Sequence, residues 1–308
     1  MKYTKLIWPV VGISAAVFSA WLLYSQVKKL SFGETMESLR SIPPQHWLLS
    51  LAATLAAYIA LAGYDRIALM HLRRKVAWAF VALCSFTSYA LSHNIGATVV
   101  SGAVIRYRAY ATRGLGAGEV GVLVAFCSLT FAIGVTTLLG IVLVLRPDIA
   151  DRFSDLLPVG LSRAAGAAML GAVVLYFLGS LLSLPVLKIG RLSIAYPRPG
   201  IIARQLLVGP LELIGATAII YFALPAAGNP GFVVVLGIFL LSFTVALLSH
   251  APGGLGVLEF VFIAGLPEMD SNAVLAALLV FRLLYLLLPL AFAIMVVLVF
   301  ERSQMAAR

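Results

Sequence analysis

Apolar segments of membrane length fill most of this chain and constrain its fold. Eight of them cover residues 6–25, 47–70, 76–92, 119–145, 164–187, 201–224, 232–249 and 272–300. A helix needs roughly 20 apolar residues to cross a hydrocarbon core about 30 Å thick, and lipid cannot satisfy the hydrogen bonds of other open backbone conformations. We therefore expect an all-α polytopic membrane protein in which residues 1–308 form a single transmembrane domain.

Composition and charge placement are typical of a bacterial inner (cytoplasmic) membrane protein. Hydrophobic residues make up 62% of the chain and charged residues 11%, which excludes an ordinary soluble domain. The net charge of +10 is concentrated in short loops, at residues 73–75, 106–113 and 188–204. Short loops rich in Lys and Arg face the cytoplasm, so the charge does not indicate a nucleic-acid partner. We expect these loops and both termini in the cytoplasm.

A short internal repeat indicates how the apolar segments are organised. SFTSYALSHNIG, residues 85–96, returns as SFTVALLSHAPG, residues 242–253, with seven of twelve positions identical. Apolar composition alone does not explain the matched Ser, Thr and His residues. Internal repeats with interrupted apolar segments are typical of transporters, whose binding site lies near the middle of the bilayer.

The loop charges predict that each repeat contains a re-entrant hairpin. If residues 76–92 crossed fully, Arg106 and Arg108 would fall outside the cytoplasm, so residues 76–112 are expected to enter from the cytoplasm and return. The acidic loop that follows 232–266 predicts a second hairpin that enters from outside. The sequence therefore predicts an inverted repeat. Its parts are repeat one at about 47–145, a linking helix at 164–187 and repeat two at about 201–300.

The second hairpin contains a glycine-rich break. Pro252 stops the preceding helix, and Gly253, Gly254 and Gly256 allow close approach of the backbone. A new half-helix starting near Gly254 would present free amides to an anionic headgroup or phosphate. The alternative is a break that only packs tightly.

The same residues resemble a known family. The string PGGLGVLE, residues 252–259, the Ser-His pair before it, and Arg106-x-Arg108 are similar to the membrane region of lysylphosphatidylglycerol synthases (multiple peptide resistance factors) and their stand-alone relatives. The resemblance covers most of residues 5–300. It implies that this region flips a lipid, whereas a separate soluble domain aminoacylates it in the synthases. No segment of this sequence has that size, so we expect lipid translocation and not an enzyme.

Two histidines and two arginines are candidate substrate-binding residues. His93 and His250 occupy equivalent positions of the repeat, where each could bind a phosphate or titrate near neutral pH. Packing is the alternative role. Arg106 and Arg108 follow the first hairpin and could receive a headgroup, or act only in setting topology.

Charged residues inside apolar segments are further candidates, because burying a charge in a membrane is costly. Glu212, Glu259 and Arg282 lie in such segments, and Arg282 could pair with either glutamate. A purely structural pair is the alternative. Asp65 and Arg66 lie nearer the cytoplasmic end and could be an interfacial anchor or a gate.

These features together favour a flippase that moves an amphipathic lipid, such as a phospholipid, a hopanoid or a polyprenyl carrier, without a cofactor or metal. One alternative is an intramembrane lipid-modifying enzyme that uses His93, His250 and Glu259 as acid-base groups. Another is a non-catalytic partner of a lipid or glycan synthase. A homodimer is compatible with the sequence.

Overall fold

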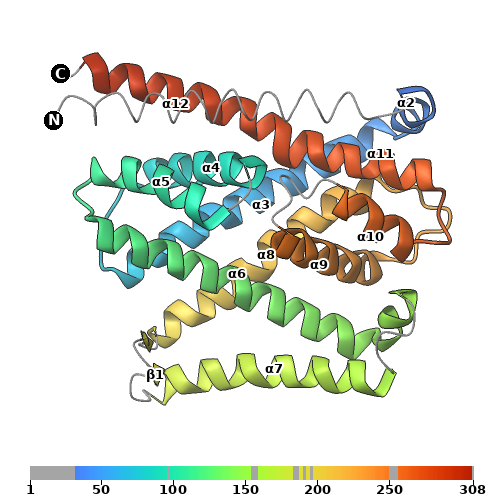
Figure 1. Cartoon of the computed structure of the whole chain (residues 1–308), viewed down its shortest axis with the longest axis horizontal. Coiled ribbons are helices and arrows are strands. Elements are labelled where there is room, and N and C mark those ends of the chain that lie inside the picture. Colours follow the sequence, from blue (N-terminus) through green and yellow to red (C-terminus); the bar gives the residue numbers. More distant parts are fainter. Residues whose placement is uncertain are drawn as a thin grey trace.

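The computed structural model describes residues 32–95, 98–153, 159–182, 187–189, 192–194, 197–249 and 256–306. These residues form helices and one antiparallel pair of short strands (Figure 1). The elements are α2 (Phe32–Arg40), α3 (Pro44–His71), α4 (Trp78–Ile95), α5 (Thr98–Ala111), α6 (Ala117–Leu145), the 3₁₀ helix η1 (Pro147–Phe153), α7 (Val159–Leu181), β1 (Leu187–Ile189), β2 (Leu192–Ile194), α8 (Pro199–Ala223), α9 (Phe232–Ser249), α10 (Val257–Gly265), α11 (Ser271–Phe281), the π-helix η3 (Arg282–Leu287) and α12 (Leu288–Ala306).

The predicted all-α membrane architecture is confirmed. Among the described residues, five helical stretches are long and apolar enough to cross a membrane; they are Pro44–His71, Ala117–Leu145, Leu161–Leu181, Pro199–Ala223 and Ser271–Phe300. The predicted helix 164–187 is wrong at its end, because α7 stops at Leu181 and residues 187–189 pair with β2. The predicted segment 6–25 lies outside the described residues.

Local sequence fixes several helix ends. Pro44 lies in the first turn of α3 and Pro199 in the first turn of α8. The backbone N–H that proline lacks has no acceptor within the helix at this position. Asp270 caps α11 by accepting a hydrogen bond from the Ala273 N–H at 3.1 Å. Glu119 reaches back to the Gly116 N–H at 3.0 Å, which favours the start of α6 because a carboxylate also complements the helix dipole.

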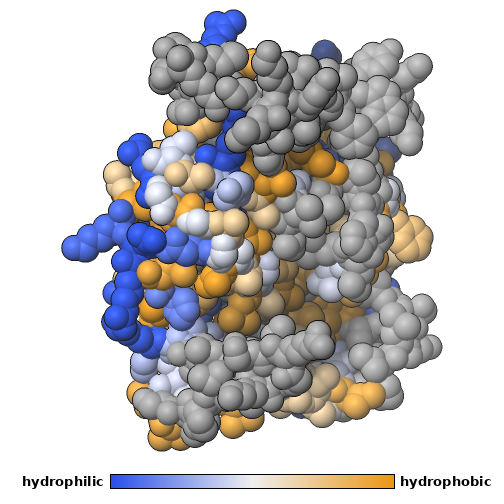
Figure 2. Space-filling view, turned by 60° about the vertical axis from the view of Figure 1, so that its left-hand side comes forward, coloured by the Kyte–Doolittle hydropathy of each residue, from blue (hydrophilic) through white to orange (hydrophobic). Residues whose placement is uncertain are grey.

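The helices form two helical hairpins that lie toward opposite ends of the molecule. Figure 1 shows α4 and α5 in the left half and α9 and α10 in the right half, among the longer helices. At one end, here called the Arg74 end, Arg74 pairs with Glu119 at 2.6 Å. At the other, the Glu268 end, Arg152 pairs with Glu268 at 2.8 Å. In Figure 2, in which the left-hand side of Figure 1 comes forward, hydrophilic side chains gather at the left edge.

Helices α3, α6 and α8 pack closely in the centre through small residues. A Cβ on Gly134 of α6 would lie 2.7 Å from the carbonyl carbon of Gly209 in α8, and one on Gly215 would lie 3.0 Å from the Cβ of Ala57 in α3. Small residues allow helices to approach in this way in membranes. The close crossing places the polar residues of α3 and α8 next to one another.

Candidate functional site

A π-helix interrupts the last long helix at the centre of the molecule. Pro289 has no N–H to donate to the carbonyl oxygen of Tyr285, four residues earlier. The helix widens here, and the Leu288 N–H bonds the Leu283 carbonyl. The Tyr285 carbonyl accepts instead from the Tyr58 hydroxyl at 3.0 Å. Single π-helical turns of this kind are frequent at functional sites.

The π-helix begins at Arg282, which forms an ion pair with the second hairpin. Its Nε and Nη2 donate to Oε1 of Glu259 in α10 at 2.9 and 2.6 Å. The Arg282 side chain is 5% exposed and that of Glu259 is 26% exposed. The Glu259 Oε2 atom also accepts from the Gly256 N–H at 2.9 Å, so Glu259 caps α10. The predicted pairing of Arg282 with a glutamate is confirmed for Glu259.

Glu212 is held by tyrosine hydroxyl groups and has no ion-pair partner among the described residues. Glu212 is only 2% exposed. The hydroxyl of Tyr285 donates to its Oε1 atom at 2.6 Å. The Tyr64 hydroxyl lies 3.4 Å from both its Oε2 atom and the carbonyl oxygen of Gly209. Glu212 is therefore a buried carboxyl group whose neighbours are polar but uncharged.

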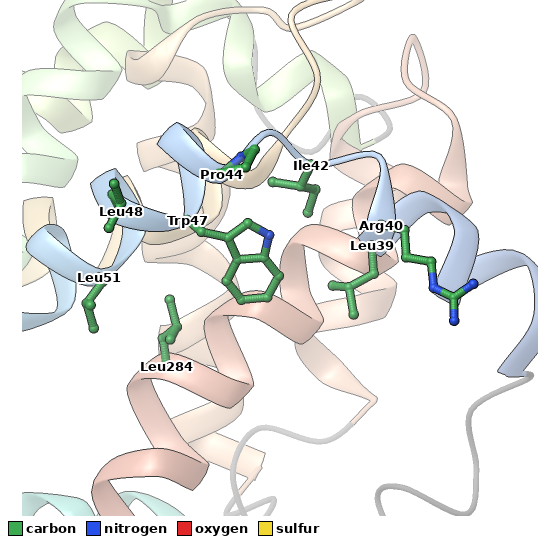
Figure 3. Close-up of a pocket in the computed structure, with 8 residues that line it drawn as sticks. All are labelled: Leu39, Arg40, Ile42, Pro44, Trp47, Leu48, Leu51 and Leu284. Atoms are coloured by element: carbon green, nitrogen blue, oxygen red, sulfur yellow. The ribbon is translucent and has the colours of Figure 1, made fainter.

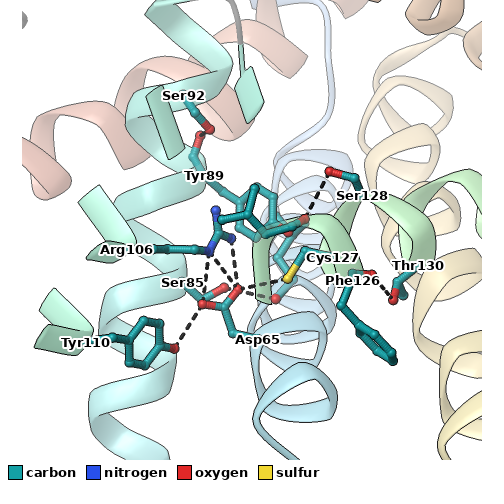
Figure 4. Close-up of polar contacts among 12 residues, drawn as sticks. Asp65, Ser85, Tyr89, Ser92, Arg106, Tyr110, Phe126, Cys127, Ser128 and Thr130 are labelled. Carbon is teal, nitrogen blue, oxygen red and sulfur yellow. Dashed lines mark hydrogen bonds and ion pairs between the residues drawn. The ribbon is translucent and has the colours of Figure 1, made fainter. Parts of the chain in front are cut away.

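A second ion pair, in which both side chains are buried, joins the first hairpin to α3 (Figure 4). The Nη2 atom of Arg106 in α5 lies 2.8 Å from Oδ1 of Asp65, and its Nε lies 3.1 Å from both carboxylate oxygens. Tyr110 also donates to Asp65 at 2.9 Å, and Cys127 of α6 approaches it at 3.5 Å. The Arg106 guanidinium lies 4.5 Å above the Tyr89 ring centroid, within cation–π distance.

This geometry corrects the expected placement of Arg106. It does not lie beyond the hairpin in a loop but inside the returning helix α5, where its side chain is 4% exposed and that of Asp65 is fully buried. Burial is tolerable because the guanidinium and the carboxylate satisfy each other in a bidentate arrangement. Asp65 accordingly lies in the interior and not at an interface. Arg108 lies on the same helix and is half-buried.

His93 lies near the end of α4 and contacts residues of both halves of the chain. Its ring stacks on Tyr285, with centroids 5.6 Å apart, and lies 6.4 Å from the Phe243 ring of α9. Its Nδ1 atom is buried and has no hydrogen-bond partner in the part of the chain that the structure describes. His250, Pro252, Gly253 and Gly254 lie outside the described residues, so the predicted proximity of the two histidines stays a prediction.

An apolar groove lies on the surface next to the π-helix (Figure 3). Its volume is about 490 Å³. Leu284, which lies between Arg282 and Tyr285, forms part of its wall, and Arg40 of α2 lies at its edge. The remaining lining residues come from the end of α2 and the start of α3 and are Leu39, Ile42, Pro44, Trp47, Leu48 and Leu51. Among the described residues, no group of three or more His, Cys, Asp and Glu side chains could hold a metal ion.

The chain has relatives along nearly its whole length. A family model described as the lysylphosphatidylglycerol synthase TM region matches residues 10–293. The uncharacterized protein slr0712 of Synechocystis sp. is 30% identical over 304 residues, which cover 98% of this chain and 94% of that protein. The inner membrane protein YbhN of Escherichia coli is 29% identical over 289 residues, which cover 91% of this chain and 88% of YbhN. A phosphatidylglycerol lysyltransferase of Staphylococcus haemolyticus is 32% identical over 91 residues, which are 29% of this chain and 11% of the transferase.

Proposed function

This chain belongs to the family of the lysylphosphatidylglycerol synthase transmembrane region, and from that premise we propose that it moves an amphipathic lipid between the leaflets of a membrane. The observation that carries the proposal is the pair of helical hairpins at opposite ends of the molecule, with a buried ion pair, a partly buried ion pair and a buried carboxyl group in the bundle.

The length of the returning helices supports re-entrant hairpins. Helix α10 has 9 residues and α5 has 14, which correspond to about 14 Å and about 21 Å at 1.5 Å per residue. Both are shorter than a hydrocarbon core about 30 Å thick. Irregular backbone at that depth is tolerated only inside protein or beside a water-filled cavity. The two hairpins would then enter from opposite faces and form the inverted repeat.

The charge distribution supports the Arg74 end as the cytoplasmic end. Residues 73–75 and Arg113 lie in its connections, as expected for positively charged loops. The Glu268 end carries Glu268 and Asp270. We infer that a headgroup moves through the polar centre while the tails stay in lipid, beside apolar surfaces such as the groove at Leu284.

Reconstitution into vesicles tests the proposal. The purified protein is placed in vesicles that contain fluorescent phosphatidylglycerol, and the fraction that dithionite quenches is followed with time. Faster exposure of inner-leaflet lipid than in protein-free vesicles supports the proposal. Arg282→Gln should slow this exchange because it breaks the pair with Glu259, whereas Arg146→Gln, at an exposed pair with Asp148, should not. A new lipid mass without leaflet exchange would instead indicate an enzyme.

A further inference from the structure

We propose that Glu212 binds and releases one proton in each transport cycle, so that lipid movement is coupled to a proton gradient. The inference rests on the proposed lipid transport, but the proton-binding site can be tested without it. In this proposal the proton is taken up from water on one side of the membrane and released to water on the other.

The first argument is the contrast between Glu212 and two other carboxylates of the bundle, the buried Asp65 and the partly buried Glu259. Asp65 and Glu259 each have an arginine within 2.8 Å. Glu212 is 2% exposed and is bonded by tyrosine hydroxyls alone among the described residues. An unpaired charge in such a place costs far more free energy than a neutral hydrogen-bonded group. Intramembrane carboxyl groups of this kind are frequent members of proton pathways.

The second argument is that the surroundings satisfy both protonation states. With Glu212 neutral, its Oε1 accepts from Tyr285, its Oε2–H donates to the Tyr64 hydroxyl oxygen, and that hydroxyl donates to the Gly209 carbonyl. With Glu212 ionised, the Tyr64 hydroxyl turns and donates to Oε2. Both acceptors lie 3.4 Å from the Tyr64 oxygen, so rotation of one hydroxyl accommodates gain or loss of the proton.

The third argument is that the proton site is linked to both hairpins through two residues of the π-helix, Tyr285 and Arg282. Tyr285 bonds Glu212 at 2.6 Å and stacks on His93 at the end of the first hairpin. It also lies in the same π-helix as Arg282, which pairs with the second hairpin at Glu259. A ligand shifts a conformational equilibrium only by its differential affinity for the two states. A proton on Glu212 can supply that difference because it changes the strength of the Tyr285 bond.

Few other groups near Glu212 could titrate around neutral pH. Helix α3 contributes Tyr58, Tyr64 and Asp65, of which Asp65 is paired with Arg106. Helix α4 contributes Tyr89 and α6 contributes Cys127. Tyrosine and cysteine side chains ordinarily titrate at alkaline pH. From α7, Tyr176 bonds Gln205, and neither α9 nor α11 carries a charged side chain or histidine. His93 is the remaining candidate, and the test must separate it from Glu212.

Infrared difference spectroscopy tests the proton site itself. Spectra of the protein in lipid are recorded from acidic to alkaline pH, and the band of a neutral carboxyl group is followed. We expect a band that disappears as the pH rises, that Glu212→Gln removes, and that His93→Phe and the exposed control Glu37→Gln retain. Absence of any band that depends on Glu212 would overturn the proposal.

Transport measurements test the coupling. In vesicles with fluorescent phosphatidylglycerol, an imposed pH gradient should change the leaflet exchange rate of the parent protein. This response should be lost in Glu212→Gln and in Tyr285→Phe, although Tyr285→Phe should retain the infrared band. An unchanged response in Glu212→Gln would refute the coupling. If the parent protein moves no lipid, the proposed function fails, whereas the infrared result still decides whether Glu212 binds a proton.

Discussion

Removing one partner of the buried pair between Arg106 and Asp65 should destabilise the protein strongly. Arg106→Met removes three charge-assisted contacts of 2.8 to 3.1 Å and leaves a carboxylate that is fully buried. Leaving one buried charge without its partner costs about 3–5 kcal/mol. Tyr110 and Cys127 still approach Asp65, but neither carries a positive charge. We expect the free energy of unfolding to fall by this amount.

A double substitution separates charge burial from packing. Arg106→Met combined with Asp65→Leu removes both charges and keeps apolar volume, and such replacements are often neutral or stabilising. The Tyr110 hydroxyl then loses its carboxylate acceptor, which costs about 1–3 kcal/mol. The double variant should therefore be more stable than either single variant.

Unfolding in mixed micelles with increasing SDS measures these free energies. Arg74→Met is the matched control, because Arg74 forms a similar bidentate pair with Glu119 but is 46% exposed. Exposed pairs contribute about 0–1 kcal/mol, so this variant should remain close to the parent. A loss below about 1 kcal/mol in Arg106→Met, or a double variant as unstable as the sum of the two single ones, would refute the reasoning.

Three further predictions follow from the packing, the site and the topology. Gly134→Ala should cost about 1–3 kcal/mol in the same SDS titration, because its Cβ would lie 2.7 Å from the Gly209 carbonyl carbon; unchanged stability would show that α6 and α8 can separate freely. His93→Phe should retain stability through ring stacking but slow leaflet exchange, and an unchanged rate would make His93 a packing residue. Cysteines introduced at Arg73 and Asp270 should be labelled from the cytoplasm and from outside, respectively, and labelling of both from one face would contradict the topology.

The sequence predicts helix positions well because membrane thickness limits their length. The expected segment 232–249 coincides with α9, and 201–224 differs from α8 by two residues at one end and one at the other. The end of α7 is missed because the prediction follows apolarity alone, although Pro185 within residues 182–187 argues against a helical continuation. Apolarity alone does not distinguish a helix from a strand in so short a run.

The contacts inside the bundle are predicted less well. The partner of Arg106 is 41 residues away in sequence, and helices that are apolar all round give no indication of which face turns inward. The sequence therefore shows Asp65 as a charged residue in an apolar segment, but it does not show that Arg106 is its partner. The π-helix does have a signal in the sequence, because Pro289 cannot satisfy the carbonyl group of Tyr285.

The ion pairs of the two hairpins have opposite polarity, because the first hairpin contributes Arg106 and the second contributes Glu259. The offset that aligns His93 with His250 also aligns Gly102 with Glu259. A Cβ at Gly102 would lie 2.9 Å from Nη1 of Arg106, so glycine leaves room there for the guanidinium group. The second hairpin has a carboxylate at the position that this offset aligns, where it is 26% exposed and also caps α10. Because that carboxylate is less buried than Asp65, separating it from its arginine is expected to cost less free energy than separating Asp65 from Arg106. We therefore expect the ion pair of the second hairpin to break more readily than that of the first.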